Sequence, residues 1–152
     1  MSKAVSAWLL LGCIAAVSAC GDTSPATPTP SPTPTVDGTW TGTLAVQDVS
    51  GRMTWTLTQT GSTVAGPVLV SLPSGTVLLN GFLTGTISGP SLIYTITVGL
   101  GGVPSQPSCA GQMTGTMAVT IAATSTLSGP MAFSSGNCLP PFASSTITLT
   151  RQ

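Results

Sequence analysis

VDGTWTGTL occupies residues 36–44 and places one tryptophan, Trp40, in a run of threonine and glycine. The threonines of this stretch lie in one register, and Trp40 and Leu44 lie in the other. Such period-two alternation is typical of a β-strand that has one buried face and one face in solvent. The stretch therefore predicts the first strand of a β-domain, with Trp40 directed into the core.

The same alternation recurs along the chain, and turn residues interrupt it seven times, at 48–52, 59–63, 73–75, 88–91, 100–108, 122–125 and 134–145. Seven breaks leave eight strands. If neighbours pair as a meander, the three short turns share one end and the two longest loops share the other. The last strand, STITLTR, can then pair antiparallel with the first, which removes both exposed edges. We predict an all-β domain over residues 37–152, an eight-stranded antiparallel up-and-down β-barrel, with no helix after Cys20.

The order of the strands brings the start of the first strand and the end of the eighth to the short-turn end. Trp40 and Arg151 should meet there, because a guanidinium over an indole ring is favourable by about 0.5–1 kcal/mol. We interpret Trp40 as a plug of this closed end; the alternative is an ordinary core tryptophan with a solvated Arg151. Four glycines share the inward parity of Trp40 and would make room for its ring and permit strand bending: Gly42, Gly66, Gly85 and Gly129.

Gly38-Thr39-Trp40 together with Arg151 resembles the closed-end signature of lipocalins and, more widely, of calycin-like barrels, which include many small bacterial lipoproteins. The resemblance implies a barrel that carries a small apolar ligand near its open end. Some bacterial protease inhibitors are similar disulfide-containing barrels. The alternative is a barrel interior filled by its own side chains. The candidate ligand-lining residues, with Tyr94 as a polar handle, are Leu44, Val46, Trp55, Val70, Leu79, Tyr94, Val98, Met113 and Phe133.

The first nineteen residues read as an export signal, with a positive charge at Lys3, an apolar run over 7–17 and a small-residue cleavage site. Val17-Ser18-Ala19-Cys20 resembles the lipobox of bacterial lipoproteins, which implies cleavage before Cys20 and its lipidation; the alternative is a conventional cleavage site. Residues 20–36 then form a lipidated, proline-rich and disordered tether of up to roughly 45 Å. We expect a lipid-anchored protein of the bacterial cell envelope, at the outer membrane and facing the periplasm or the surface.

Cys109 and Cys138 are the cysteines that remain in the barrel domain. An even pair in an exported chain predicts a disulfide, and both residues fall at the long-loop end of the meander. The alternative is a pair of buried free thiols. The loop that follows Cys138 carries an apolar tip that is either a contact site for a partner or a lid over the barrel mouth: Leu139, Pro140, Pro141 and Phe142.

Charged residues are scarce, at 4% of the sequence, and histidine and glutamate are missing. Without a basic patch, nucleic-acid binding is not expected. Catalysis is not expected either, because the usual general bases are missing and Asp37 and Asp48 should lie at opposite ends of one strand. No metal or nucleotide motif is found, so we expect no cofactor. A membrane-spanning barrel is disfavoured by the few aromatics and the uncharged interior. We expect a monomeric, noncatalytic module that contacts a protein, a polymer or an apolar small molecule.

Overall fold

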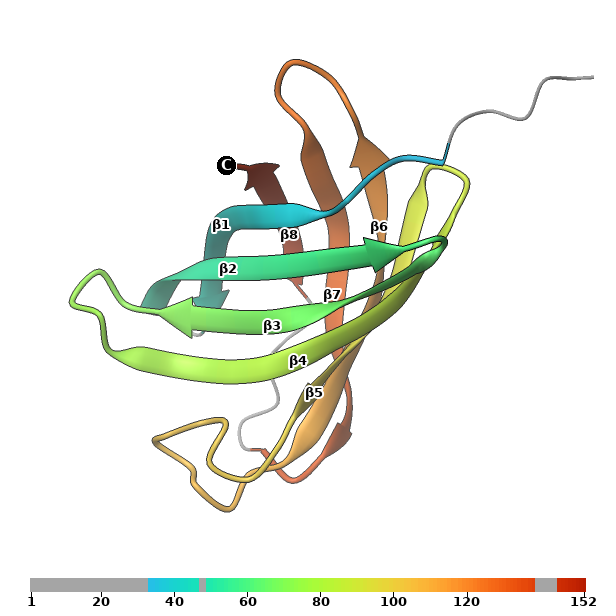
Figure 1. Cartoon of the computed structure of the whole chain (residues 1–152). Helices are drawn as coiled ribbons and strands as arrows, with labels where there is room; N and C mark the ends of the chain where they lie inside the picture. Colours follow the sequence, from blue (N-terminus) through green and yellow to red (C-terminus); the bar gives the residue numbers. More distant parts are fainter. Residues whose placement is uncertain (1–32, 47–48, 139–144) are drawn as a thin grey trace, which may run out of the picture. The chain divides into compact units, whose positions relative to one another are not determined.

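The computed structural model describes residues 33–46, 49–138 and 145–152 (Figure 1). The described chain forms eight β-strands in sequence order: β1 (Gly38–Val46), β2 (Val49–Thr60), β3 (Thr63–Ser71), β4 (Val77–Ser88), β5 (Ser91–Val98), β6 (Gly111–Thr120), β7 (Thr126–Gly136) and β8 (Ser145–Arg151). Each strand pairs antiparallel with the next, and β1 pairs antiparallel with β8, so the sheet closes on itself. The predicted eight-stranded up-and-down barrel is confirmed.

The barrel has two different ends. One end carries the turns after β2, β4 and β6, and β1 begins and β8 ends there; we call it the closed end. The opposite end, the open end, carries the connections after β1, β3, β5 and β7, of which the β3–β4 connection at residues 72–76 and the β5–β6 loop at residues 99–110 are described in full. The three turns that the sequence predicts to be short therefore share the closed end, whereas the equally short β1–β2 connection, residues 47–48, belongs to the open end.

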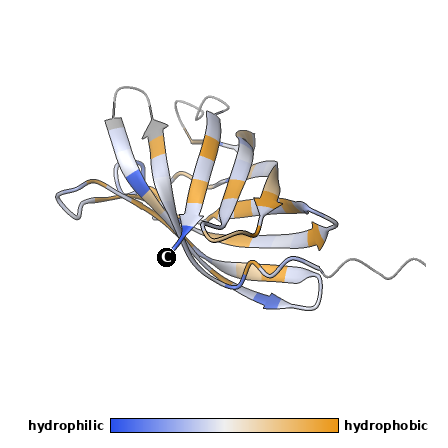
Figure 2. Ribbon diagram, turned by 90° about the horizontal axis from the view of Figure 1, so that it is seen from above, coloured by the Kyte–Doolittle hydropathy of each residue, from blue (hydrophilic) through white to orange (hydrophobic). Residues whose placement is uncertain are grey.

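Alternating side chains explain why these segments pair. Apolar and weakly polar residues follow one another along the strands (Figure 2), and burial alternates in the same way, as in β5, where every second residue is buried. The apolar residues face inward and form one hydrophobic core, while threonine covers most of the outside. The strand ladders satisfy the backbone hydrogen-bonding groups. Burial of the apolar side chains stabilises the fold by about 25 cal/mol for each Å² of apolar surface removed from water.

Four predicted breaks are longer than the true connections, namely 48–52, 59–63, 88–91 and 134–145. Residues 49–52 were expected in a turn, but they belong to β2 and pair with β1, with Val46 opposite Val49. Likewise, β7 continues through Gly136, which pairs with Gly111. In both places glycine and serine resemble turn chemistry, and Arg52 adds a charge in the first, yet the partner strand holds the chain extended.

The inward-facing glycines allow the backbones of neighbouring strands to approach closely. A Cβ atom on Gly66 would collide with the carbonyl oxygen of Thr56, and one on Gly129 would collide with that of Thr116. At all four positions expected to make room for the Trp40 ring, the three atoms nearest to such a Cβ belong to neighbouring strands rather than to Trp40. Their role is to let strands approach closely where the barrel bends.

Candidate functional site

Trp40 fills the closed end. Its side chain is fully buried, and its Nε1 donates a hydrogen bond to the carbonyl of Val36 at 2.8 Å. Arg151 lies opposite Trp40 in the β1–β8 ladder, and its guanidinium carbon is 5.7 Å from the centroid of the indole ring. The structure thus brings these two residues together as the sequence predicts. An indole N–H that finds a partner inside the core adds stability that a purely apolar plug would lack.

Arg151 also binds the chain just before β1. Its guanidinium donates to the carbonyl oxygens of Thr35 and Asp37. Gly38 lies directly beneath it, with φ of 114°, and a Cβ there would lie 3.4 Å from the arginine Nε. A left-handed conformation and close cover by Arg151 both favour glycine at this position. This is the physical reason for the glycine in the Gly38-Thr39-Trp40 motif.

Gln59 is a closed-end residue that sequence analysis missed. Its Oε1 accepts a hydrogen bond from the Val36 N–H at 2.7 Å, and its Nε2 donates to the carbonyls of Pro34 and Gly61. Its own backbone N–H donates to the Asp37 carboxylate. The alternation along β2 could have revealed it, because Gln59 falls on the inward-facing side of the strand and is the polar residue among apolar ones there. Val36, which the sequence assigned to the tether, is fully buried in the barrel core.

The residues expected to line a ligand lie in the barrel core. Seven of them are fully or almost fully buried, namely Leu44, Trp55, Val70, Leu79, Tyr94, Val98 and Met113. Phe133 is half-buried against the same cluster, and the side chain of Val46 lies outside the described set. The structure therefore brings the predicted residues together, and they pack against one another in the hydrophobic core.

Two aromatic side chains meet across the interior. The rings of Trp55 and Tyr94 make an edge-to-face contact with centroids 5.1 Å apart. The Tyr94 hydroxyl donates to the carbonyl of Pro130 at 3.1 Å, and burial raises the pKa of this phenol well above its ordinary value. Trp55, in contrast, is fully buried, and its Nε1 has no hydrogen-bond partner in the described part of the chain. An unsatisfied buried donor costs about 1–3 kcal/mol.

A disulfide and hydrogen bonds fix the conformation of the β5–β6 loop at the open end. Cys109 and Cys138 form the predicted disulfide, with their Cα atoms 4.7 Å apart. The Gly101 N–H donates to the Pro107 carbonyl, and the Asn137 side chain bonds to Ala110 and Ser108. Leu100, at the start of this loop, keeps 76% of its surface in solvent. The predicted contact residues Leu139, Pro140, Pro141 and Phe142 lie outside the described residues.

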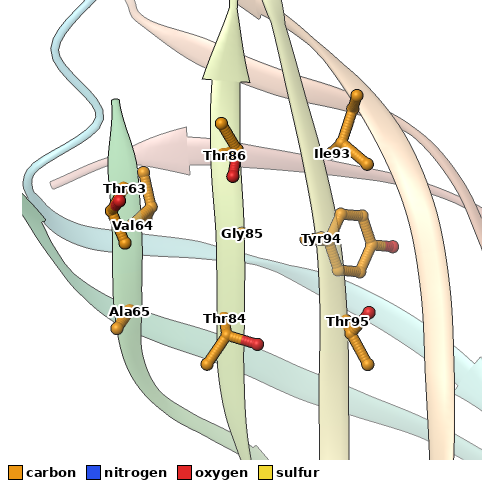
Figure 3. A pocket seen from close by; sticks show the side chains of 9 residues that line it. All are labelled: Thr63, Val64, Ala65, Thr84, Gly85, Thr86, Ile93, Tyr94 and Thr95. Carbon is orange, nitrogen blue, oxygen red and sulfur yellow. The ribbon is translucent and has the colours of Figure 1, made fainter. Parts of the chain in front are cut away.

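Two shallow cavities of about 420 Å³ each lie on the barrel wall formed by β3, β4 and β5. One has Gly85 at its centre, between Val64 and Tyr94 on the flanking strands, with threonines on all three strands around it (Figure 3). The other lies further along the same strands toward the open end and is lined by Pro67, Phe82 and the loop at 99–102, among others. We call the two together the wall groove.

The charge distribution limits the chemistry of all these places. The sequence carries no Asp, Glu, Lys, Arg or His between Arg52 and Arg151. No group of three or more metal-ligating residues occurs within residues 33–46, 49–138 and 145–152. In those same ranges, no helix has the length and apolarity needed to cross a membrane. Asp48, one of the two aspartates considered as a carboxylate pair, lies outside the described residues.

Comparison with protein-family models, with curated proteins and with solved structures finds no match to this chain.

Proposed function

We propose that this chain is a noncatalytic interaction module of the bacterial cell envelope, held to the membrane by lipid on Cys20. The observation that carries the proposal is the β5–β6 loop, which presents a largely exposed Leu100 on a loop fixed by a disulfide and internal hydrogen bonds. A preorganised loop loses little conformational entropy on binding. An exposed aliphatic side chain on such a loop can anchor a protein partner by filling a pocket on the partner's surface.

The proposed anchor rests on the sequence, in which Val17-Ser18-Ala19-Cys20 resembles a lipobox and a proline-rich segment follows. Two or three acyl chains hold a protein stably at a membrane, where one chain does not. Residues 34–37 contact Gln59 and Arg151 at the closed end. A tether that leaves from this end would direct the open end and Leu100 away from the membrane, toward a partner.

The contact proposal is tested in intact cells with a photoreactive amino acid in place of Leu100. We expect a covalent adduct of defined mass on irradiation. The matched control is the same substitution at Ile121, which is 51% exposed but lies in a closed-end turn. Adducts at both positions or at neither would contradict the proposal. The anchor is tested separately with Cys20→Ser, which should abolish acylation and release the protein or leave it unprocessed.

A second function, carriage of a small apolar molecule, is favoured by one observation, the unpartnered Nε1 of Trp55 in the core. A bound molecule with one hydrogen-bond acceptor would satisfy this donor, and lipocalin-like barrels carry ligands in that place. Native mass spectrometry of the full chain should then detect a retained molecule that Trp55→Phe releases. If no molecule is retained and Trp55→Phe is as stable as the parent protein or more stable, the interior is a filled core.

A further inference from the structure

We infer that the wall groove is a binding site for a neutral, hydroxyl-rich ligand, namely an uncharged oligosaccharide lying along the outer face of β4. This inference goes beyond the proposed function, because it assigns a ligand class to the barrel wall, with Leu100 of the open-end loop at one margin of the second cavity. It rests on the geometry of the groove, on its free hydroxyl groups and on its lack of charge.

The groove is built from three rows of outward-facing residues across β3, β4 and β5. Their pairing places Thr63, Thr86 and Ile93 in the first row, Ala65, Thr84 and Thr95 in the second, and Pro67, Phe82 and Thr97 in the third. Neighbouring strands lie about 4.8 Å apart and successive rows about 6.7 Å apart. The two cavities follow one another along these rows, so an extended chain of small rings fits their combined length.

The hydroxyl groups in the groove are available to a ligand. Thr63, Thr84, Thr86 and Thr95 all line the first cavity, and none of them makes a side-chain hydrogen bond within the described part of the chain. Elsewhere on the outer face, Ser128 and Thr148 bond to each other at 3.0 Å. Each free threonine hydroxyl both donates and accepts a hydrogen bond. Such a set matches a ligand whose own groups are hydroxyls of the same kind.

Phe82 gives the groove an apolar platform. Its side chain is half exposed, and Pro67 and Thr97 lie beside it in the ladder. A sugar ring presents C–H groups on its face and hydroxyls around its edge. The face can therefore stack on Phe82 while the edge reaches the threonines of the next row. Ile93, also half exposed, offers a second apolar contact in the first row.

Charge and backbone pairing exclude the main competing ligands. No charged side chain lines either cavity, so a charged ligand would lose hydration in the groove and find no counter-charge among the lining residues. An extended peptide that adds a strand needs a free sheet edge, but β3, β4 and β5 are each paired on both sides. A lipid chain would leave the four threonine hydroxyls unsatisfied. A neutral glycan carries no charge, needs no free sheet edge and can form hydrogen bonds with the threonine hydroxyls.

Saturation-transfer-difference NMR of the full chain in detergent micelles tests the inference, with micelles alone as the blank. The probes are neutral hexasaccharides of glucose, mannose and N-acetylglucosamine, with oligogalacturonate as the acidic comparison. We expect at least one neutral probe to bind with a dissociation constant of about 1 mM or tighter, and the acidic probe not to bind. Binding by none of the neutral probes, or equal binding by oligogalacturonate, would overturn the inference.

Variants locate the site. Phe82→Thr should weaken binding of the positive probe about tenfold. Thr84→Val, which removes one hydroxyl with little change of shape, should weaken it about fivefold. The control is Thr56→Val on the outer face of β2, which should bind as the parent does. All three residues are exposed, so melting temperatures should stay within a few degrees and folding is not at issue. Unchanged binding in both groove variants would overturn the assignment.

Discussion

Trp40 and Arg151 face each other where β1 meets β8, with the guanidinium 5.7 Å from the centre of the indole ring. The ladder between these two strands contains three residue pairs, whereas β1 and β2 share nine. Contacts of the Arg151 side chain therefore contribute a large share of the interactions that close the barrel. Its stacking on Trp40 and its hydrogen bonds to Thr35 and Asp37, just before β1, both join β8 to the start of β1.

Arg151→Lys should lower the free energy of unfolding by about 1–2 kcal/mol. Lysine keeps the charge but loses the planar group that stacks on Trp40 and donates to two carbonyls. Chemical denaturation of both proteins measures the difference. Arg52→Lys is the matched control, because Arg52 is exposed on β2, and it should change stability by less than about 0.5 kcal/mol. Equal losses in the two variants would contradict a special role for Arg151.

Gln59→Met should destabilise the closed end by about 2–3 kcal/mol. The substitution preserves the length of the side chain but leaves the part-buried N–H of Val36 without its acceptor. Gln112→Met on the exposed face of β6 is the control and should be close to neutral. Thermal unfolding of the three proteins checks this, and a neutral Gln59→Met would show that water replaces the amide at no cost.

Reduction of the Cys109–Cys138 bond should lower the free energy of unfolding by about 3.5 kcal/mol, the value for a closed loop of this length. For a domain of this size the melting temperature should fall by roughly 10–20 °C. Scanning calorimetry with and without reductant measures the shift. Peptide mapping without reductant should recover one linked pair, and two alkylatable thiols in the unreduced protein would contradict the prediction.

Stability should decline as pH rises above about 10, because Tyr94 is protonated in the folded barrel but ionises in the unfolded chain near its ordinary pKa. Burial raises the folded-state pKa, so the stabilisation is complete below pH 10 and is lost progressively above it. The slope should approach about 1.4 kcal/mol per pH unit.

Tyr94→Phe is the control for this titration, since it removes the chain's one tyrosine. The variant should lose about 1 kcal/mol at neutral pH, from the hydrogen bond to Pro130, and should lack the alkaline slope. Ultraviolet absorbance of the folded parent protein should show no tyrosinate until it unfolds. A phenol that titrates near pH 10 in the folded state would contradict its burial.

The fold could be predicted because strand pairing in this chain follows a simple alternation. Threonine and apolar residues alternate with few exceptions, and glycine and proline mark the turns. The errors arose where composition and pairing disagree, as at residues 49–52, which resemble a turn but pair with β1. Strand ends depend on the partner strand, which local sequence does not contain.

The site residues were harder to predict than the fold, because they contact residues that are far away in the sequence. The disulfide and the contact of Trp40 with Arg151 agree with strand order, because the meander brings the two members of each pair to the same end of the barrel. The bonds of Gln59 to Pro34 and Val36 could not, since they depend on how the chain approaches β1. The wall groove was missed because its threonines look like any outer face until register aligns them across three strands.

The short seam between β1 and β8 has a consequence for the order of folding. Seven of the eight strand pairs are hairpins, whereas Arg151 and the Asp37 carbonyl are 114 residues apart. Local pairs form early and the distant pair last, so the chain should pass through a curved, unclosed sheet. In that species the outer margins of β1 and β8 are both unpaired and able to join strands of another molecule. Weakening the contact of Arg151 with Trp40 should therefore increase self-association of the chain.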